Sequence, residues 1–358
     1  MAKEAQSDKA ELGSVLVAGG CGFLGHHVVD LLVSSYSCKI TVIDIRTIRN
    51  RRPASDGVRY FDTDICEPEA LDKVFKEVKP DVVIHTKVNV EGTRSIIESC
   101  QRHHVKALVY TSSASVVSDN VTDLINVDER WPLITGKLQT EYYSQTKAEA
   151  ELLVLAANRQ TPTNLLTCAI RPSGIFGEGD QQVTPAALNV YKSGKNKFQL
   201  GPNDNLYDFT HVKNVAHAHL LAARALLQTY KSAVIPLDHE RVDGEAFFVT
   251  NGEPVYFWDF LKAIWALQGS QMGADDFRVI GKKPGIFIGW LAETICWCLG
   301  RQLLFTRQRV IYTNMTRYFN IEKARTRLGY MPLYGLHEGL ERSVKWFLGE
   351  EKRQKKSQ

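Results

Sequence analysis

The sequence has few cysteines and little excess of charge of either sign. Seven cysteines are spread over 358 residues without a C-x-x-C spacing, so we expect reduced thiols and neither a disulfide framework nor a zinc site. The 44 basic and 40 acidic side chains give a net charge of +4, and four of the basic ones lie within the last seven positions. Because the rest of the chain is nearly neutral, no nucleic-acid partner is expected.

Signals for disorder, repeats and secretion are also missing. The chain is 44% hydrophobic and 23% charged, which is average for a globular protein and excludes a disordered chain, a collagen or a coiled coil. The first residues, MAKEAQSDKAELG, lack the apolar segment of a signal peptide. At roughly 100–200 residues per domain, the length predicts two domains or one large one.

Short apolar strands alternate with helical patterns through the first half of the chain. Strands are predicted at 14–17, 39–45, 81–86, 107–112 and 164–171, and helices at 25–35, 69–79, 88–103 and 138–158. This alternation predicts an α/β fold with a doubly wound parallel sheet, covered by helices on both faces. We expect a dinucleotide-binding Rossmann core at 1–177. A mainly substrate-binding region with returning core elements follows at 178–349, and a basic tail at 350–358.

A glycine motif follows the first predicted strand and leads directly into a helix. In GGCGFLG at 19–25, Gly19 permits a tight turn, Gly22 lets backbone amides approach a pyrophosphate, and Gly25 lets the helix pack closely on the sheet. The helix N-terminus adds N–H donors and partial positive charge. The motif therefore predicts a dinucleotide site that also includes Phe23 and Leu24.

Asp44 ends the second predicted strand, about 19 residues past Gly25. A carboxylate at this position accepts hydrogen bonds from ribose hydroxyls and repels a 2′-phosphate, which favours NAD. Arginines follow at 46, 49, 51 and 52, where they would either bind such a phosphate or form a solvated loop. We expect NAD as the cofactor, with NADP as the alternative.

Tyr143 and Lys147 stand four positions apart on one predicted helix, so their side chains point the same way. An ordinary tyrosine, with a pKa of about 10, is a poor base at neutral pH. A lysine cation one turn away stabilises the phenolate and lowers that pKa. Ser113 and neighbouring hydroxyls end the strand before this helix, at the sheet edge where ligands bind. This position favours a catalytic role over a surface Tyr–Lys pair.

Together these motifs resemble those of the extended short-chain dehydrogenases/reductases. The match is carried by Ala18–Gly25, Ser113, the Tyr143-x-x-x-Lys147 pair and RPSGIFG at 171–177. Within that superfamily the chain is most similar to the 3β-hydroxysteroid dehydrogenases, especially the sterol-4α-carboxylate 3-dehydrogenases (decarboxylating) of fungi. VNVEGTR at 88–94, VYTSSASV at 109–116, IRPSGIFGEGD at 170–180 and FFVTNGEPVYFWDF at 247–260 extend the match. The last is the most specific, because sugar epimerases of this fold do not usually carry it.

The resemblance implies NAD(P)-dependent oxidation of the 3β-hydroxyl of a sterol 4α-carboxylate, with decarboxylation to the 3-ketosteroid in ergosterol-type synthesis. Tyr143 is then the general base, Lys147 its electrostatic partner and a ribose ligand, and Ser113 a hydrogen-bond partner of the substrate oxygen. The resemblance also places Asp64, Ile65, Asn89, Tyr143, Lys147, Pro172 and Ile175 at the cofactor. A dehydrogenase of a specialised triterpenoid or steroid pathway is an alternative.

The connection after the fourth strand departs from the family pattern. The family has a loop of about twenty residues there, whereas short loops are common in such sheets generally. Here only Thr86, Lys87 and Val88 separate His85 from Asn89. A truncated gene model, a splice variant and altered activity are alternatives, and a non-catalytic NAD-binding scaffold is a further hypothesis.

The sequence offers three histidines, His211, His217 and His219, as candidate metal ligands. They lie in a predicted strand and the apolar helix after it, and His217 and His219 are two apart, so they do not share a helix face. We therefore expect no metal.

The segment at 285–300 is unusually apolar, and Glu293 is its only charge. As a helix its 16 residues reach about 24 Å, which is less than the hydrocarbon core of about 30 Å. It is either a buried helix or an interfacial membrane contact with Trp290 and Trp297 at the headgroups.

The C-terminal residues add a signal for location. Lys355 and Lys356 stand four and three places from the C-terminus, the spacing of the dilysine retrieval signal of endoplasmic reticulum membrane proteins. With a sterol substrate dissolved in lipid, this spacing predicts the cytosolic face of that membrane. Other enzymes of sterol C4 demethylation and a second copy of the chain are further candidate partners.

Overall fold

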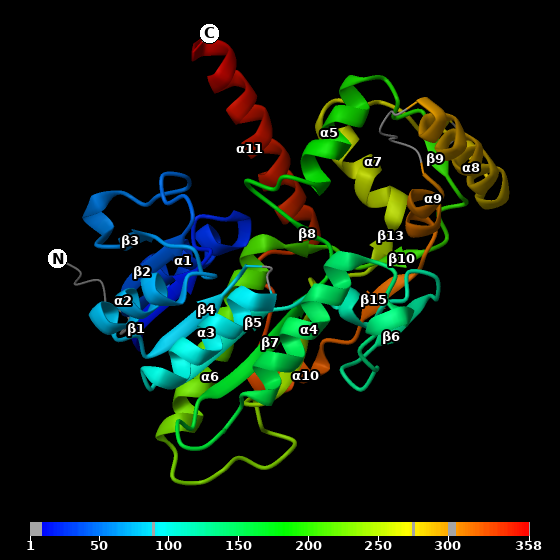
Figure 1. The fold of residues 1–358 in the computed structure, drawn as a ribbon. Coiled ribbons are helices and arrows are strands. Elements are labelled where there is room, and N and C mark those ends of the chain that lie inside the picture. The colour runs from blue at the N-terminus through cyan, green and yellow to red at the C-terminus, as the bar shows by residue number, and fades with distance from the viewer. Residues whose placement is uncertain (1–8, 88–89, 274–275, 300–305, 358) are drawn as a thin grey trace.

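A parallel sheet forms the centre of the molecule. The computed structural model describes residues 9–87, 90–273, 276–299 and 306–357 (Figure 1). The seven strands of this sheet follow the order β12-β7-β5-β4-β1-β2-β3. They are β1 (Ala10–Ala18), β2 (Tyr36–Asp44), β3 (Arg59–Asp62), β4 (Val82–His85), β5 (Ala107–Thr111), β7 (Leu166–Pro172) and β12 (Glu245–Val249). The chain runs outward from β1 in both directions, which confirms the doubly wound α/β fold. In such sheets ligands bind where the order reverses, here between β1 and β4.

Helices cover both faces of this sheet, because side chains alternate along each strand. Val15 and Val17 of β1 pack with residues of α1 (Phe23–Ser35) and α6 (Val212–Lys231). Leu16 and Ala18 face the opposite way. They pack with α2 (Pro68–Val78), α3 (Val90–Arg102) and α4 (Tyr142–Ala156). The two apolar faces of one strand thus explain the continuous hydrophobic runs in the sequence.

The second half of the chain forms a smaller region beyond the carboxyl edge of the sheet. A four-stranded sheet joins β13 (Val255–Tyr256), β10 (Leu206–Tyr207), β15 (Arg317–Phe319) and β6 (Leu124–Val127). Two pairs join β8 (Ile175–Phe176) to β11 (Thr210–His211) and β9 (Phe198–Leu200) to β14 (Arg278–Ile280). Helix α10 (Glu322–Leu328) returns to pack on β12 and α6, and the helices of the smaller region are α5 (Val183–Lys192), α7 (Phe257–Leu267), α8 (Lys282–Leu299), α9 (Arg307–Thr313) and α11 (Leu336–Ser357). Its core is aromatic, with Phe209 stacked on Phe260.

The predicted strands and helices are found with shifted ends, and the shift at the start of α4 is among the largest. The sequence predicts this helix from 138, but it begins at Tyr142. The residues just before α4 form a short 3₁₀ turn, η3 (Gly136–Leu138). Two similar turns lie elsewhere in the chain, η1 (Ala54–Asp56) and η2 (Ala114–Val117). Gln139 donates from its amide to the carbonyl of Ser118 (3.1 Å). This bond holds Gln139 against the segment after β5 and keeps it outside the helix.

The described cysteines and histidines do not form a cluster typical of a metal site. Within the described ranges Cys21, Cys38, Cys100 and Cys168 are free thiols. Over the same ranges no three His, Cys, Asp or Glu side chains gather as a metal site would require. His211 pairs with Glu178 (3.1 Å), and His219 with Thr111 (2.6 Å).

Candidate active site

The turn between β1 and α1 has the geometry that a pyrophosphate requires. Gly19 has a positive φ of 83° and donates its N–H to Ile43 of β2 (2.8 Å). A Cβ added at Gly25 would lie 2.1 Å from the Gly19 carbonyl oxygen, so only glycine lets the helix start this close to the strand. Gly22 caps α1, and Phe23 and Leu24 are its first residues. Their free N–H groups and the helix dipole suit an anion, so these residues fit a bound dinucleotide.

Asp44 lies at the end of β2, directly beside this turn. Its carboxylate accepts from the backbone N–H of Cys21 (3.2 Å) and of Ile45 (2.8 Å). The same carboxylate pairs with the Lys87 ammonium at 2.9 Å. Asp44, which the sequence analysis assigns to the ribose, therefore lies at the carboxyl edge of the sheet. Its carboxylate is already paired with Lys87, a partner that the motif did not predict.

The remaining predicted cofactor positions are spread along the carboxyl edge. Ile65 is buried against Gly92 of α3, where a Cβ would come within 2.4 Å of its Cδ1. Asp64 accepts from the N–H of Cys66 (3.0 Å). Pro172 ends β7, and Ile175 begins β8. Asn89 lies outside the described residues.

Ser113 and Tyr143 meet at the end of β5. Ser113 caps η2 and accepts from the N–H of Ser115 (3.2 Å). Tyr143 is the second residue of α4, and 46% of its surface is exposed. Burial of part of the ring raises the pKa of Tyr143, and a hydrogen bond with Ser113 acts in the opposite direction. The expected lowering of the Tyr143 pKa is therefore wrong for the ligand-free protein.

Lys147 is buried beneath the site, with 1% of its surface exposed. Its ammonium donates to the Thr111 carbonyl and lies 4.8 Å from the centre of the Tyr110 ring. Burial lowers the pKa of Lys147 to about 7, and the carboxylate of Glu151 partly opposes this shift. The ammonium of Lys147 is therefore held by the carbonyl at the end of β5, in the strand that leads to Ser113.

A buried ion pair fixes the catalytic helix on the sheet. Glu151, one turn after Lys147, accepts two hydrogen bonds from Arg171 of β7, the shorter at 2.5 Å. The two side chains are 0% and 5% exposed. The Arg171 guanidinium also lies 5.3 Å from the centre of the Phe248 ring. Arg171 belongs to the RPSGIFG motif, but the sequence analysis did not predict its partner Glu151. The position of Glu151 one helical turn after Lys147 is the sequence feature that could have indicated it.

His219 of α6 supports the end of β5 from the opposite face. Its Nδ1 bonds to the Val215 carbonyl (2.8 Å), so Nε2 accepts from the Thr111 hydroxyl (2.6 Å). Burial lowers the pKa of His219 to about 4, which keeps the ring neutral. Thr111 therefore joins His219 to Lys147, a link between positions 108 residues apart that the sequence pattern did not reveal.

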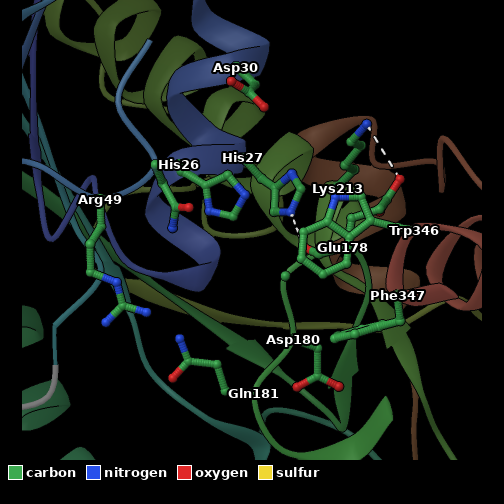
Figure 2. A pocket seen from close by; sticks show the side chains of 12 residues that line it. His26, His27, Asp30, Arg49, Glu178, Asp180, Gln181, Lys213, Trp346 and Phe347 are labelled. Carbon is green, nitrogen blue, oxygen red and sulfur yellow. Dashed lines mark hydrogen bonds and ion pairs between the residues drawn. The ribbon is translucent and has the colours of Figure 1, made fainter. Parts of the chain in front are cut away.

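A cavity of about 550 Å³ opens beside the first turns of α1 (Figure 2). It is lined by His26, His27, Asp30, Arg49, Asn50, Glu178, Gly179, Asp180, Gln181, Lys213, Trp346 and Phe347. Glu178 organises its inner wall, because it pairs with His211 (3.1 Å) and with Arg342 of α11 (3.2 Å). Burial alone would raise the pKa of Glu178, but the hydrogen bond with His211 and the nearby charge of Lys213 lower it well below its usual value. The cavity thus lies between α1 of the Rossmann core and α11.

Residues 16–277 match the model of the 3-beta hydroxysteroid dehydrogenase/isomerase family. The chain is 40% identical to the decarboxylating sterol-4-alpha-carboxylate 3-dehydrogenase of Schizosaccharomyces pombe, over 95% of this chain and 99% of that protein. The protein of the same name from Homo sapiens is 34% identical, over 92% and 87%. Among solved structures, a UDP-glucose 4-epimerase from Thermotoga maritima superposes with a TM-score of 0.67 at 18% identity, covering 94% of this chain and 99% of that one. This last likeness shows the fold alone.

Proposed function

Because the chain belongs to the 3-beta hydroxysteroid dehydrogenase/isomerase family, we propose that it oxidises the 3β-hydroxyl of a sterol 4α-carboxylate with NAD(P). The product then loses carbon dioxide to give the 3-ketosteroid. The observation that carries this proposal is the similarity, over nearly the whole chain, to proteins named for this decarboxylating dehydrogenation. The meeting of Ser113 and Tyr143 beside the glycine turn supports it.

Tyr143 takes the proton of the 3β-hydroxyl, and Ser113 holds the substrate oxygen by a hydrogen bond. Both residues stand near the carboxyl end of β5, and Ser113 is close enough to Tyr143 to act on its pKa, which supports this pairing of roles. Lys147, on the same face of α4, stabilises the phenolate and binds the nicotinamide ribose. Bound NAD(P) supplies the acceptor for the C3 hydride.

Loss of carbon dioxide requires no further side chain. Oxidation of C3 places a ketone in the β position to the 4α-carboxylate. That ketone accepts the electron pair as the carbon–carbon bond breaks, so the reaction proceeds without a dedicated base. The role of this chain is therefore to position the hydroxyl and hold its proton.

The dinucleotide is placed across the β1–β4 edge of the sheet. Gly19, Gly22, Phe23, Leu24 and Gly25 hold the pyrophosphate, and Asp44 binds the adenosine ribose. The close packing of Gly25 on Gly19 and the position of Asp44 beside Cys21 support this placement. The other cofactor positions assigned here are Asp64, Ile65, Asn89, Pro172 and Ile175.

Helix α8 gives the protein a contact with the membrane surface. Gly285 and Gly289 pack against α9, where a Cβ at Gly289 would lie 2.8 Å from the Arg307 nitrogen. Glu293 also pairs with Arg307 (2.6 Å). The close packing on α9 turns the large apolar side chains outward, and those exposed are Phe287, Ile288, Trp290 and Leu291. The buried-helix alternative is therefore wrong for these four residues, and the side chain of Trp297 lies outside the described residues.

This apolar face suits a lipid surface. No helix in the described part of the chain is both long and apolar enough to cross a bilayer. In Figure 1, α8 lies at the margin of the smaller region, away from the sheet. Lys282 and Lys283 are exposed at its start, where they suit anionic headgroups. The assigned location is the cytosolic face of the endoplasmic reticulum membrane, with Lys355 and Lys356 exposed at the end of α11.

The activity is tested with a 4α-carboxy-3β-hydroxysterol in detergent, with NAD⁺ or NADP⁺, and with products identified by mass spectrometry. We expect a decarboxylated 3-ketosteroid from the parent and none from Tyr143→Phe. A sterol without the carboxylate is the substrate control, and it should give a ketone but no carbon dioxide. Dinucleotide binding without any ketone would contradict the proposal and favour the scaffold hypothesis.

A further inference from the structure

The short connection after β4 carries Lys87 across the glycine turn. Thr86 fixes the path of this connection, because its N–H (3.0 Å) and its hydroxyl (2.9 Å) both donate to the Ala18 carbonyl. A Cβ added at Gly19 would lie 2.8 Å from Cγ of Lys87 and 3.6 Å from its Cε. The lysine side chain therefore lies along the turn on which the pyrophosphate is placed.

The ammonium of Lys87 reaches the acid assigned to the ribose. Its Nζ is 2.9 Å from Oδ1 of Asp44, and the two side chains are 23% and 9% exposed. An ion pair with this little exposure is weakly screened by solvent and salt. Among the described residues, the second carboxylate oxygen of Asp44 accepts from one group, the backbone N–H of Cys21. The negative charge at the ribose position is thus offset from within the chain.

This offset changes which ribose the site accepts. An unpaired carboxylate at this position excludes a 2′-phosphate by charge repulsion. A lysine beside it cancels that repulsion and can itself bind a phosphate. Further positive charge lies on the loop after β2: Arg51 stacks 4.6 Å from the centre of the Tyr60 ring, and Arg49 lines the adjoining cavity (Figure 2).

We infer that Lys87 is a specificity-determining residue, which pairs with Asp44 so that the site accepts the 2′-phosphate of NADP as well as the free ribose of NAD. The inference rests on the proposed function in one respect, that the chain binds a dinucleotide. It assigns to the Lys87 side chain the acceptance of NADP, which Asp44 alone would not allow.

Binding of NADH and NADPH to the full-length protein, measured by calorimetry, tests this assignment. Lys87→Met should weaken NADPH relative to NADH by at least about tenfold, the scale of one charge-assisted contact. Lys87→Gln, which keeps a polar side chain, should act in the same direction, and Lys87→Arg should retain the parental ratio. The matched control is Lys106→Met, which removes a lysine paired with Asp81 (2.6 Å) at the opposite edge of the same sheet. It should leave the ratio unchanged.

The outcomes separate the two proposals. If folded Lys87→Met and Lys87→Gln both keep the parental NADPH to NADH ratio within twofold, the specificity role of Lys87 is overturned while dinucleotide binding stands. If the folded parent binds neither dinucleotide, the proposed function is overturned, and this inference with it. A loss of NADPH affinity in Lys106→Met equal to that in Lys87→Met would also overturn the assignment, because it would reflect overall charge.

Discussion

Removing Arg171 should destabilise the protein strongly, because its partner is a buried carboxylate. Glu151 is 0% exposed and is held by two guanidinium N–H groups, so Arg171→Met leaves its charge without its hydrogen-bonded partner and without access to water. Breaking a buried pair in this way costs about 3–5 kcal/mol of unfolding free energy. The double variant Arg171→Met/Glu151→Met removes both charges. Since an apolar pair of similar volume is often neutral, we expect the double variant to be more stable than Arg171→Met alone.

The matched control is an exposed ion pair of the same length. Arg130 and Asp128 are also 2.5 Å apart, but their side chains are 91% and 31% exposed. Arg130→Met should cost about 1 kcal/mol or less, the usual range for a surface pair. Denaturant titrations followed by fluorescence and circular dichroism measure the parent and all three variants. Equal costs for Arg171→Met and Arg130→Met would refute the reasoning that burial makes the Arg171 pair important.

Four further outcomes are expected. Tyr143→Phe should lower turnover by at least about 10²-fold with little change in dinucleotide affinity; turnover within threefold of the parent would place the base elsewhere. Asp44→Ala should shift the binding preference from NAD toward NADP, and an unchanged affinity ratio would mean that Asp44 does not face the ribose. Serine at Phe287, Trp290 and Leu291 should release the protein from lipid vesicles, whereas serine at the still more exposed Val234, Ile235 and Leu237 should not; retained binding would refute the α8 contact. Burial lowers the pKa of Lys147 from 10.5 to about 7, so between these two pH values the unfolded chain keeps a proton that the folded state has lost. The free energy of unfolding of the parent should therefore rise with pH from about 7 to 10.5, relative to that of Lys147→Met. Parallel stability curves for the two proteins would show that Lys147 is not buried as a charge.

Local patterns in the sequence predicted most of the Rossmann core, because each strand and helix is specified by its own residues. The glycine motif, Asp44 and the Tyr143–Lys147 spacing predicted which residues stand at the carboxyl edge. Those patterns did not predict the partners across the sheet. The pairs Lys87–Asp44 and Thr111–His219 meet because the fold brings distant segments together, so no spacing in the sequence predicts them.

Burial was the second property that the sequence predicted poorly. The Y-x-x-x-K spacing predicts that Lys147 faces Tyr143, but it does not reveal that the lysine is enclosed by Tyr110 and the Thr111 carbonyl. Burial of Tyr143 itself likewise raises the tyrosine pKa, opposite to the direction that a nearby lysine would give. The apolar segment was similarly ambiguous, because hydropathy does not show that Gly285 and Gly289 pack inward and leave Trp290 exposed.

The central claim is that this chain couples oxidation of a sterol 4α-carboxylate to loss of its carboxyl group. Its most direct test is a single incubation of the full-length protein with a substrate isotopically labelled at that carboxyl. Reduced NAD(P), labelled carbon dioxide and 3-ketosteroid are then counted together. The account predicts equal amounts of all three, and none of them from Tyr143→Phe. Bound dinucleotide without its reduction, or carbon dioxide released without it, would contradict the account.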